Sequence, residues 1–282
     1  MMQSYKYAVL GNPIEHSLSP VLHEAGYRAI GLDASYERIK VTKETLPATV
    51  QNLVEQKFNG WNVTYPLKGE IIQYLDEIDP RARLLGAVNT VKVSGKRLLG
   101  YNTDGPGLIR GLTSQGFSTK DKKVTIFGAG GAAKAVALAL AETGAKVTVI
   151  NRSFEKAQNL VELLLAQGYE AATLAIGQTT GNRLLTQCLA GTDIVVQATS
   201  VGLEKEKYPY PLHGLRAGTV AIDLIYNPPK TDFMIKSHLQ GCEVLNGLSM
   251  LLYQGVLAWE IWLDACAPVS EMKTALYQSS IP

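Results

Sequence analysis

The run Gly128 to Ala133 holds three glycines in a spacing that lets a chain turn sharply and bring its backbone close to another molecule. It follows the apolar run Val124 to Phe127, which is typical of a short buried strand, and leads into an Ala- and Leu-rich run that predicts a helix as far as Thr143. At such a turn, free backbone N–H groups meet the charge of a pyrophosphate. The last alanine replaces the usual third glycine. The pattern predicts a dinucleotide-binding loop.

The next expected strand, Lys146 to Ile150, is followed by Asn151 and Arg152. A site for NAD usually has an acidic residue here, roughly 20 residues after the loop, which accepts a hydrogen bond from the ribose 2′-hydroxyl. Arginine cannot accept that bond, but its fork of donors suits a 2′-phosphate, and Lys156 adds a second positive charge one helical turn further on. These residues predict NADP rather than NAD as the cofactor.

Strands and helices must hold these residues, and the chain contains two series of such elements. Their alternation predicts sheets covered by helices, so we expect an α/β protein of two domains. Residues 1–104 are predicted to form the first α/β domain. Its expected elements are strands over Tyr5 to Gly11, Ser35 to Val41 and Gly60 to Thr64, helices over Pro20 to Ile30, Glu44 to Glu55 and Gly69 to Asp76, and a hairpin of Ala87 to Val93 with Arg97 to Tyr101.

Residues 105–245 are predicted to form a Rossmann-type NADP-binding domain around the glycine turn. Residues 246–282 contain an apolar helix and are expected to join the first domain again, as in proteins whose cofactor domain lies mid-chain. A cleft between the two domains is then expected to hold the site. Besides the elements around the turn, the expected elements after the first domain are helices over Asp104 to Gly116, Phe154 to Ala166 and Met250 to Leu263, and strands over Ala171 to Ile176, Asp193 to Gln197 and Thr219 to Leu224.

The composition excludes several classes of protein. The formal net charge is +2 and 18% of residues are charged, with no basic stripe, so we expect no nucleic-acid partner. No apolar run reaches the length of a membrane span and no signal peptide is recognisable, so we expect no membrane partner and a cytoplasmic protein. Cys188, Cys242 and Cys266 lack the paired spacing of a metal site. They are expected to be buried thiols in a reducing compartment, and no metal is expected.

Motifs with distinctive polar residues lie on both sides of the glycine turn. They are GNPIEHSLSP at 11–20, NVTYPLK at 62–68, GAVNT at 86–90, GYNTD at 100–104, NRS at 151–153, ATSVG at 198–202, DLIYNP at 223–228 and GLSML at 247–251, followed by Gln254. Together they resemble the shikimate dehydrogenase family, NADPH-dependent reductases of the pathway to chorismate, over essentially the whole chain. The resemblance implies reversible reduction of 3-dehydroshikimate to shikimate in aromatic amino acid biosynthesis. It also implies a small-molecule substrate held by the N-terminal domain, NADP as cofactor, and a monomer or homodimer.

The resemblance further implies which residues bind. Ser17 and Ser19 would bind the substrate carboxylate, with Tyr226 nearby, and the N-terminus of the helix at Pro20 would favour that charge. The ring hydroxyls and the reacting oxygen would be held by Thr64, Lys68, Asn89, Asp104 and Gln254. The cofactor would be bound by Gly128, Ala129, Gly130, Gly131, Ala132, Asn151, Arg152, Ser153, Lys156, Thr199, Leu224 and Gly247.

Lys68 and Asp104 are the predicted catalytic pair. An ammonium group can stabilise a developing alkoxide and then donate a proton to it, and a neighbouring carboxylate keeps that ammonium charged and oriented. Histidine also titrates near neutrality, which leaves His16 as an alternative acid. Considered singly, these residues have simpler interpretations. Lys68 is then a solvated lysine at a helix start, and Asp104, Ser17 or Ser19 is a helix N-cap.

Three positions depart from the family's usual pattern. Ser153 stands where threonine is usual and keeps the hydroxyl. Lys156 stands where arginine is frequent. The lysine keeps the positive charge but cannot bind a phosphate in bidentate fashion, which weakens the expected preference for NADP. Leu224 stands where methionine is frequent. The alternatives are a quinate/shikimate dehydrogenase that uses NAD, which commonly has an acid after the Asn-Arg pair, and a non-catalytic NADPH-binding regulatory module. The segment Tyr208 to Pro211 is expected to be a connecting turn, with a cover over the cofactor as the alternative.

Overall fold

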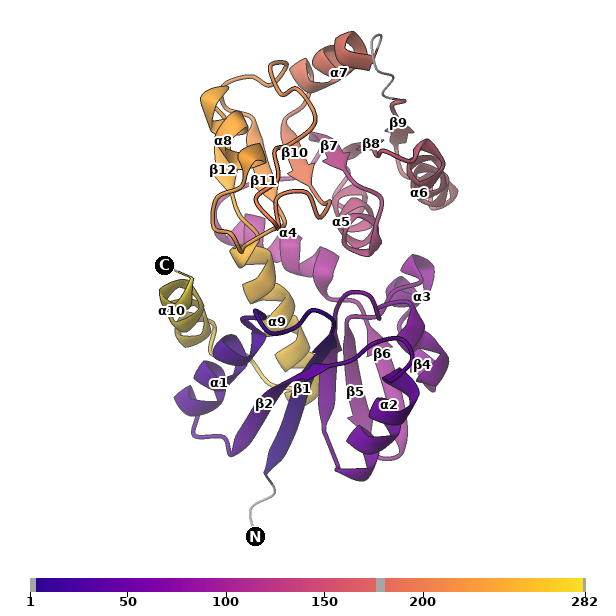
Figure 1. Cartoon of the computed structure of the whole chain (residues 1–282), viewed down its shortest axis with the longest axis vertical. Coiled ribbons are helices and arrows are strands. Elements are labelled where there is room, and N and C mark those ends of the chain that lie inside the picture. Colours follow the sequence, from indigo (N-terminus) through magenta and orange to yellow (C-terminus); the bar gives the residue numbers. More distant parts are fainter. Residues whose placement is uncertain (1–3, 176–180, 281–282) are drawn as a thin grey trace. The chain divides into compact units, whose positions relative to one another are not determined.

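The computed structural model describes residues 4–175 and 181–280, and the chain divides into two compact units. The first unit comprises Met1–Gly107 with Leu251–Pro282, and the second comprises Leu108–Met250. Each boundary lies inside a helix, α4 (Asp104–Ser114) or α9 (Leu248–Leu263), both labelled in Figure 1. The sequence places the boundaries at residues 104 and 246, because a helix that continues from one unit into the next shows no break in its pattern.

A mixed sheet forms the centre of the first unit. Its strands are β1 (Tyr5–Gly11), β2 (Ala34–Lys40), β3 (Gly60–Val63), β4 (Glu77–Ile78), β5 (Thr90–Ser94) and β6 (Arg97–Tyr101). They lie in the order β2-β1-β3-β5-β6-β4. β1 is parallel to β2 and β3, whereas β5 is antiparallel to both of its neighbours. The end of β3 and the start of β5 therefore meet at one edge of the sheet.

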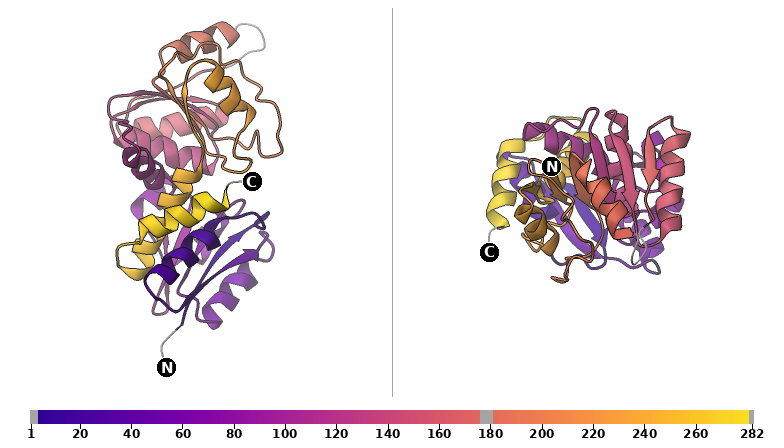
Figure 2. Two further views of the ribbon diagram at one scale, coloured as in Figure 1. Left: turned by 90° about the vertical axis from the view of Figure 1, so that its left-hand side faces the viewer. Right: turned by 90° about the horizontal axis from the view of Figure 1, so that it is seen from above.

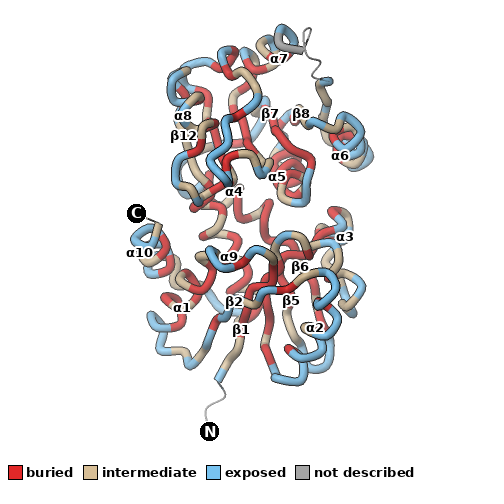
Figure 3. Tube along the Cα trace, viewed as in Figure 1, coloured by how far each residue is buried: buried red, intermediate tan, exposed pale blue. Residues whose placement is uncertain are grey.

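One face of this sheet packs on α2 (Leu46–Glu55). Ala8 and Leu10 of β1 point to this face and are fully buried, since alternate residues of a strand share a side. The buried residues of α2 recur at the spacing of a helical stripe and are Leu46, Val50 and Leu53. Figure 3 shows how these buried residues follow the strands and the inner sides of the helices. Apolar burial at this face holds the first unit's sheet in place.

Aromatic rings cover the other face of the same sheet. Tyr7 stacks on Trp262 of α9, with ring centroids 4.7 Å apart, and the Trp262 Nε1–H donates to the Val91 carbonyl at 2.8 Å. Tyr7 also stacks on Tyr27 of α1 (Ser19–Ala29). The helix α10 (Val269–Ser279) lies beside α1, as Figure 2 shows. These contacts explain why the C-terminal residues belong to the first unit.

The second unit is a parallel sheet with helices in its crossovers. Its strands are β7 (Lys123–Phe127), β8 (Lys146–Ile150), β9 (Ala171–Thr173), β10 (Ile194–Gln197), β11 (Val220–Asp223) and β12 (Glu243–Leu245). Their order is β12-β11-β10-β7-β8-β9, and every pair is parallel. This is the Rossmann order, in which the direction of winding reverses between β7 and β10. The predicted fold class, α/β with a Rossmann-type second domain, is confirmed.

Several elements differ from the sequence predictions. The expected helix over Gly69 to Asp76 is a short 3₁₀ helix, η1 (Glu70–Tyr74), and the expected strand Ala87 to Val93 begins only at β5. Of the expected strand Ala171 to Ile176, β9 covers the first three residues, and Ile176 lies outside the described residues. The helices and strands that the sequence prediction missed are α3 (Pro80–Leu85), α7 (Gly181–Ala190), α8 (Asp232–Leu239), α10, β4 and β12.

The missed helix α3 has readable end signals. The Asp79 side chain caps its start by accepting from the N–H groups of Arg81 and Ala82, and proline is its first residue. Gly86 ends it in the left-handed conformation, with φ of 61°. The helix is shorter than the windows in which helical periodicity is recognised, which is why the pattern alone did not predict it.

The cysteines only partly match their prediction. Cys242 is buried and Cys188 is half-buried, but Cys266 is exposed, so the expectation of buried thiols is wrong for Cys266. Cys266 lies in the connection between α9 and α10, where few side chains are available to cover it. Across the part of the chain that the structure describes, no helix combines the length and apolar character needed to cross a membrane.

His23 is a fully buried titratable residue of the aromatic layer. Its side chain is fully buried, and its ring lies parallel to that of Tyr36, with centroids 4.5 Å apart. Within the described residues neither ring nitrogen has a hydrogen-bond partner. Burial lowers the pKa of His23 to about 3, so the imidazole stays neutral in the folded chain.

This burial predicts acid lability of the first unit. Below its ordinary pKa of 6.5, His23 binds a proton in the unfolded chain but not in the folded chain, so its contribution to stability is present above that pH and lost as the pH falls towards 3. We expect the free energy of unfolding to fall about 1.4 kcal/mol per pH unit more steeply than in a His23→Phe variant between roughly pH 6 and pH 4. Chemical denaturation followed by tryptophan fluorescence measures this, since Trp61, Trp259 and Trp262 all lie in the first unit.

A His16→Gln variant is the matched control for this prediction, because His16 is exposed on the same unit. It should keep the slope of the unaltered chain. Equal slopes for His23→Phe and the unaltered chain would show that His23 takes up its proton without unfolding.

Candidate functional site

The Lys68 ammonium and the Asp104 carboxylate form a close ion pair in the first unit. Lys68 Nζ lies 2.5 Å from Asp104 Oδ2, and the side chains are 21% and 7% exposed. Lys68 follows a tight turn in which the Leu67 N–H donates to the Thr64 carbonyl, and Asp104 is the first residue of α4. The simpler interpretation of Lys68 as a solvated lysine is therefore wrong. Asp104 Oδ2 accepts from an ammonium, and Asn102 Oδ1 accepts the Asp104 backbone N–H.

Asn89 holds the other oxygen of this carboxylate. Its Nδ2 donates to Asp104 Oδ1 at 2.8 Å and to Thr103 Oγ1 at 2.9 Å. Its Oδ1 accepts the Thr103 backbone N–H at 2.8 Å, which fixes the amide orientation because a backbone N–H can only donate. Both carboxylate oxygens of Asp104 are thus hydrogen-bonded, as a buried carboxylate requires.

Strand register explains why these residues meet. In the antiparallel pair of β3 and β5, Asn62 is opposite Thr90, and in the pair of β5 and β6, Thr90 is opposite Tyr101. The residues just after β3, just before β5 and just after β6 therefore gather at one edge of the sheet. Lys68, Asn89 and Asp104 come from these connections. The sheet order, which brings together segments distant in sequence, builds the pair.

The predicted carboxylate-binding serines lie at the start of α1. Ser19 is buried and is the first helical residue, while Ser17 is half-buried and its Oγ accepts the Ser19 N–H at 3.3 Å. The N-cap position belongs to Leu18, so the interpretation of either serine as the N-cap residue is wrong. A helix N-terminus with nearby hydroxyls suits a carboxylate.

Thr64 and Gln254 complete the polar residues predicted in the first unit. Thr64 continues β3, and its N–H donates to the Leu10 carbonyl at 2.8 Å. At Gly11 a Cβ would lie 2.4 Å from Thr64 Cγ2, so only glycine allows β1 to approach this closely. Gln254 is buried on α9, and its Nε2 donates to the Leu251 carbonyl at 2.9 Å. Direct hydrogen bonds link Lys68, Asp104 and Asn89, whereas Thr64 and Gln254 are held by backbone groups.

The glycine turn follows β7 at the reversal point of the parallel sheet. Gly128 has φ of 122°, and a Cβ there would lie 2.8 Å from the Ala198 carbonyl oxygen after β10. Gly130 is the N-cap residue of α5 (Gly131–Glu142), and no atom lies within 4 Å of a Cβ built at Gly130 or Gly131. The turn is therefore open at the Cβ positions of these two glycines. This arrangement fits the pyrophosphate of a dinucleotide.

Replacing Gly128 with alanine is expected to weaken NADP binding at least about 10-fold, because the added Cβ must displace the backbone after β10 or the turn itself. The dissociation constant, measured by isothermal titration, tests this. Gly168→Ala is the matched control, since Gly168 also has positive φ in the second unit but no atom near its Cβ position. Similar affinities for the Gly128→Ala variant and the unaltered chain would contradict a close backbone approach as the reason for this glycine.

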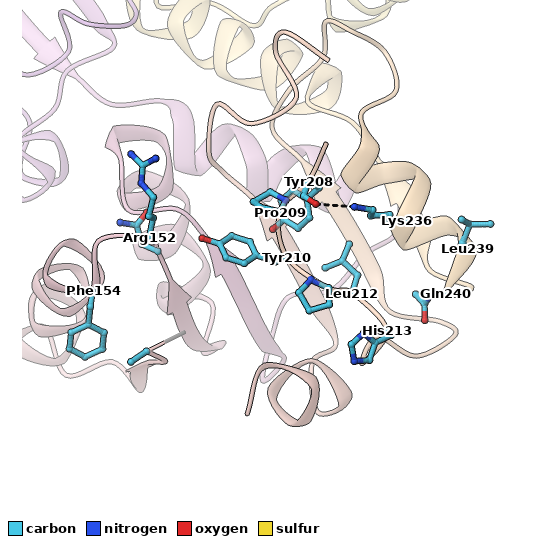
Figure 4. A pocket seen from close by; sticks show the side chains of 13 residues that line it. Arg152, Phe154, Tyr208, Pro209, Tyr210, Leu212, His213, Lys236, Leu239 and Gln240 are labelled. Atoms are coloured by element: carbon cyan, nitrogen blue, oxygen red, sulfur yellow. Dashed lines mark hydrogen bonds between the residues drawn. The ribbon is translucent and has the colours of Figure 1, made fainter. Parts of the chain in front are cut away.

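A cavity of about 1070 Å³ lies next to Asn151 and Arg152 in the second unit. Figure 4 shows Arg152 on one side and the segment from Tyr208 to His213 on the other. The lining also includes Phe154, Ala175, Lys236, Leu239 and Gln240. The volume exceeds what a nucleoside needs. Of the four cofactor-binding residues predicted after β8, Asn151 and Arg152 line this cavity, whereas Ser153 and the exposed Lys156 lie outside its lining.

The segment from Tyr208 to Pro211 is more than the plain connecting turn that we expect from its sequence. Tyr210 stacks on Phe127 at the end of β7, with centroids 5.3 Å apart, and Tyr208 meets the same ring edge-on. Lys236 Nζ donates to the Tyr208 carbonyl at 2.9 Å (Figure 4). Stacking and this bond fix the segment against the sheet, so it forms one wall of the cavity.

The remaining predicted residues of the second unit lie after β10, β11 and β12. Thr199 is held by Gln197 Oε1, which accepts from its N–H and its hydroxyl, each at 2.9 Å. A Cβ at Gly247 would lie 2.1 Å from the Leu224 carbonyl oxygen, so these two predicted residues are in contact. Tyr226 follows Leu224 and is half-buried. All three connections leave the carboxyl end of the parallel sheet, where such folds bind ligands.

Asp223, which precedes Leu224 in the motif DLIYNP, has no role assigned from the sequence. It is fully buried, and its carboxylate accepts from the Thr231 hydroxyl at 2.5 Å and from the Ile225 N–H at 3.0 Å. Burial raises its pKa to about 6, against the effect of both hydrogen bonds. These bonds close the segment that carries Leu224 and Tyr226. The signal that could have identified Asp223 is an acidic residue at the end of an otherwise apolar strand.

The sheet order, the glycine turn at its reversal point and the buried ammonium–carboxylate pair define a class. The chain is an α/β protein whose first unit carries a pair equipped for acid–base chemistry and whose second unit is built to bind a dinucleotide. Matches to family profiles show which family within this class the chain belongs to. Residues 9–91 match the shikimate dehydrogenase substrate binding domain, residues 112–205 match shikimate / quinate 5-dehydrogenase, and residues 247–277 match the shikimate 5′-dehydrogenase C-terminal domain. The chain belongs to the shikimate dehydrogenase family.

Individual relatives agree with this assignment. The chain is 46% identical over 273 residues to the shikimate dehydrogenase (NADP(+)) of Desulfitobacterium hafniense strain Y51, covering 97% of each chain. It is 35% identical to shikimate 5-dehydrogenase from Thermus thermophilus, solved with NADP(H) and shikimate, with a TM-score of 0.87 over 98% of this chain and 100% of that one. A quinate dehydrogenase from Corynebacterium glutamicum, solved with NAD, gives 29% identity and the same TM-score, 0.87, over 98% and 99%. Overall fold therefore does not separate these activities.

Proposed function

We propose that this chain catalyses the reversible NADPH-linked reduction of 3-dehydroshikimate to shikimate, a step of aromatic amino acid biosynthesis. The observation that carries the proposal is the Lys68–Asp104 ion pair, 2.5 Å long and largely withdrawn from solvent, in a family whose relatives are named shikimate dehydrogenase (NADP(+)). A non-catalytic NADPH-binding module has no need of such a pair, because burying two charges costs more than burying apolar groups of similar size.

Lys68 is the proposed proton donor. NADPH, when bound, supplies the hydride that reduces the ketone carbon. The Lys68 ammonium stabilises the negative charge that develops on the oxygen and then protonates it, and in the reverse direction the neutral amine takes the hydroxyl proton. Asp104 holds the ammonium in place through Oδ2, while Asn89 holds Asp104 through Oδ1. A neighbouring carboxylate favours the charged form of the lysine.

The remaining polar residues of the first unit are proposed to bind the substrate. Ser17 and Ser19 at the start of α1 would take the carboxylate, since hydroxyl and backbone N–H donors there stabilise a negative charge without a counter-ion. Tyr226 of the second unit is proposed as a further substrate-binding residue. Thr64, Asn89 and Gln254 would hold ring hydroxyls or the reacting oxygen. These serine, threonine, asparagine and glutamine side chains are neutral donors and acceptors. They suit the hydroxyl groups and the single carboxylate of a small ring.

The connections of the second unit are proposed to bind NADP. The glycine turn and the start of α5 would take the pyrophosphate, and Arg152 the 2′-phosphate beside the cavity that Asn151 also lines. The full set is Gly128, Ala129, Gly130, Gly131, Ala132, Asn151, Arg152, Ser153, Lys156, Thr199, Leu224 and Gly247. The enzyme is proposed to act in the cytoplasm as a monomer or homodimer, and light scattering of the purified protein decides between these two states.

One assay with four arms tests the proposed function: shikimate or quinate as substrate, with NADP or NAD as cofactor, followed by the absorbance of the reduced nicotinamide. We expect the highest kcat/KM with shikimate and NADP. A preference for quinate with NAD would instead support the catabolic relative. Absence of turnover in every arm, together with measurable NADPH binding, would support a regulatory module.

A further inference from the structure

We infer that Tyr36 is a positioning residue for the Lys68–Asp104 pair and acts on it through a buried series of hydrogen bonds that runs across the first unit. Tyr36 lies on β2, two strands away from the end of β3, and none of the motifs that identify the family contains it. The inference rests on the proposed function, because it assigns Tyr36 a part in holding the proton donor of that reaction.

The series begins at the Tyr36 hydroxyl. Tyr36 Oη donates to Asn62 Oδ1 at 2.6 Å, and both residues are buried. Asn62 Nδ2 donates in turn to Thr90 Oγ1 at 3.0 Å and to the Asn89 carbonyl at 3.1 Å. The Asn89 carbonyl can only accept, so it fixes the orientation of the Asn62 amide and turns Asn62 Oδ1 towards Tyr36.

The series ends at the catalytic pair. Thr90 Oγ1 donates to Asn89 Oδ1 at 3.0 Å, and Asn89 Nδ2 donates to Asp104 Oδ1 at 2.8 Å. Asp104 Oδ2 accepts from Lys68 Nζ. Each donor from Tyr36 onwards points in the same direction, towards the Asp104 carboxylate. Hydrogen bonds aligned in this way strengthen one another away from water, so the whole series orients Asp104.

The surroundings of Tyr36 keep its hydroxyl a donor. Burial raises the pKa of Tyr36 far above its ordinary value, so the phenol keeps its proton at any pH at which the fold persists. His23 stacks on the Tyr36 ring at an interplanar angle of 5°, which fixes the plane of the ring.

Removing this hydroxyl tests the inference. We expect Tyr36→Phe to lower kcat about 10-fold, which corresponds to the loss of one buried hydrogen bond, while the KM for shikimate changes less than about twofold. Thr90→Val interrupts the series at its middle and should have a similar effect, whereas Thr90→Ser restores the hydroxyl and should recover most of kcat. The double variant Tyr36→Phe/Thr90→Val should lose little more than either single variant, because both break the same series.

Tyr7→Phe and Tyr27→Phe are the matched controls. Each removes a buried hydroxyl from the same aromatic layer, and within the described residues neither hydroxyl has a hydrogen-bond partner. Both should keep the kcat of the unaltered chain. Unchanged kcat in Tyr36→Phe, or an equal loss in Tyr27→Phe, would overturn the inference. If the unaltered chain turned over no substrate, the proposed function itself would fail, and that result is distinct from an active chain indifferent to Tyr36.

Discussion

Replacing Lys68 with methionine is expected to lower kcat by about 10³-fold, within the range that a positioned acid or base contributes to proton transfer. Methionine keeps an unbranched side chain of similar length, so packing around the turn after β3 is preserved while the proton donor is lost. The affinity for NADP should stay the same, since the residues proposed to bind it belong to the second unit. Steady-state kinetics in both directions and a titration with NADPH measure these two quantities.

The chain offers a closely matched control for this substitution. Lys43 forms an ion pair with Glu70 of the same 2.5 Å length, but there the side chains are 54% and 38% exposed. Lys43→Met should leave kcat unchanged, because an exposed pair contributes little. A Lys68→Met variant with kcat within about threefold of the unaltered chain would remove Lys68 from the proton transfer, and His16 would become the residue to test next.

Asp104→Asn separates two functions of the carboxylate, which accepts a hydrogen bond from Asn89 and holds the Lys68 ammonium by its charge. The amide oxygen can still accept from Asn89, but the group that faces Lys68 becomes a donor and the negative charge is gone. We therefore expect kcat to fall about 10²-fold or more, with the fold of the first unit retained. Tryptophan fluorescence, which reports on that unit alone, checks the fold.

Replacing Arg152 with alanine is expected to raise the KM for NADP about 10- to 50-fold while changing the KM for NAD much less. Arg152 is exposed beside the cavity, and its guanidinium is the charged fork proposed to bind the 2′-phosphate that only NADP carries. Lys156→Ala should have a smaller effect in the same direction, since a lysine contributes a point charge without bidentate geometry. The ratio of kcat/KM for the two dinucleotides measures the preference.

Arg216→Ala is the control for the Arg152 prediction. Arg216 is an exposed arginine of the same unit and is not among the residues that line the cavity. Removing it changes the net charge of the protein equally, so any general effect of charge on NADP binding appears in both variants. Equal changes in KM for NADP and NAD in the Arg152→Ala variant would contradict its assignment to the 2′-phosphate.

Much of the second unit was predictable from the sequence because its signals are local. The glycine turn, the strand before it and the helix after it are contiguous, and the apolar strands of a buried parallel sheet stand out as short continuous runs. The packing of the segment from Tyr208 to Pro211 was not predictable in this way. Its role as a cavity wall depends on stacking against Phe127, which is distant in sequence.

The candidate site of the first unit was predictable only in part. Lys68, Asp104 and Asn89 were predictable from the motifs, because these residue types suit the chemistry and the order of the motifs resembles a known family. Tyr36 lies in no motif, and Asn62 and Thr90 lie in motifs but received no role, because a tyrosine in a strand or an asparagine near a turn has a simpler interpretation. Their hydrogen bonds depend on which strands are neighbours. The short strand β4 and the place of α10 beside α1 depend on such long-range packing as well.

The two α/β domains, the dinucleotide turn and the residue types available for acid–base chemistry were predictable from the chain alone, because each is a pattern of neighbouring residues. The buried pairing of the Lys68 ammonium with the Asp104 carboxylate, and the series of donors from Tyr36 that ends on that carboxylate, came from the folded structure. Burial and pairing depend on neighbours in space rather than in sequence. The antiparallel register of β3, β5 and β6 creates those neighbours from segments far apart in the chain.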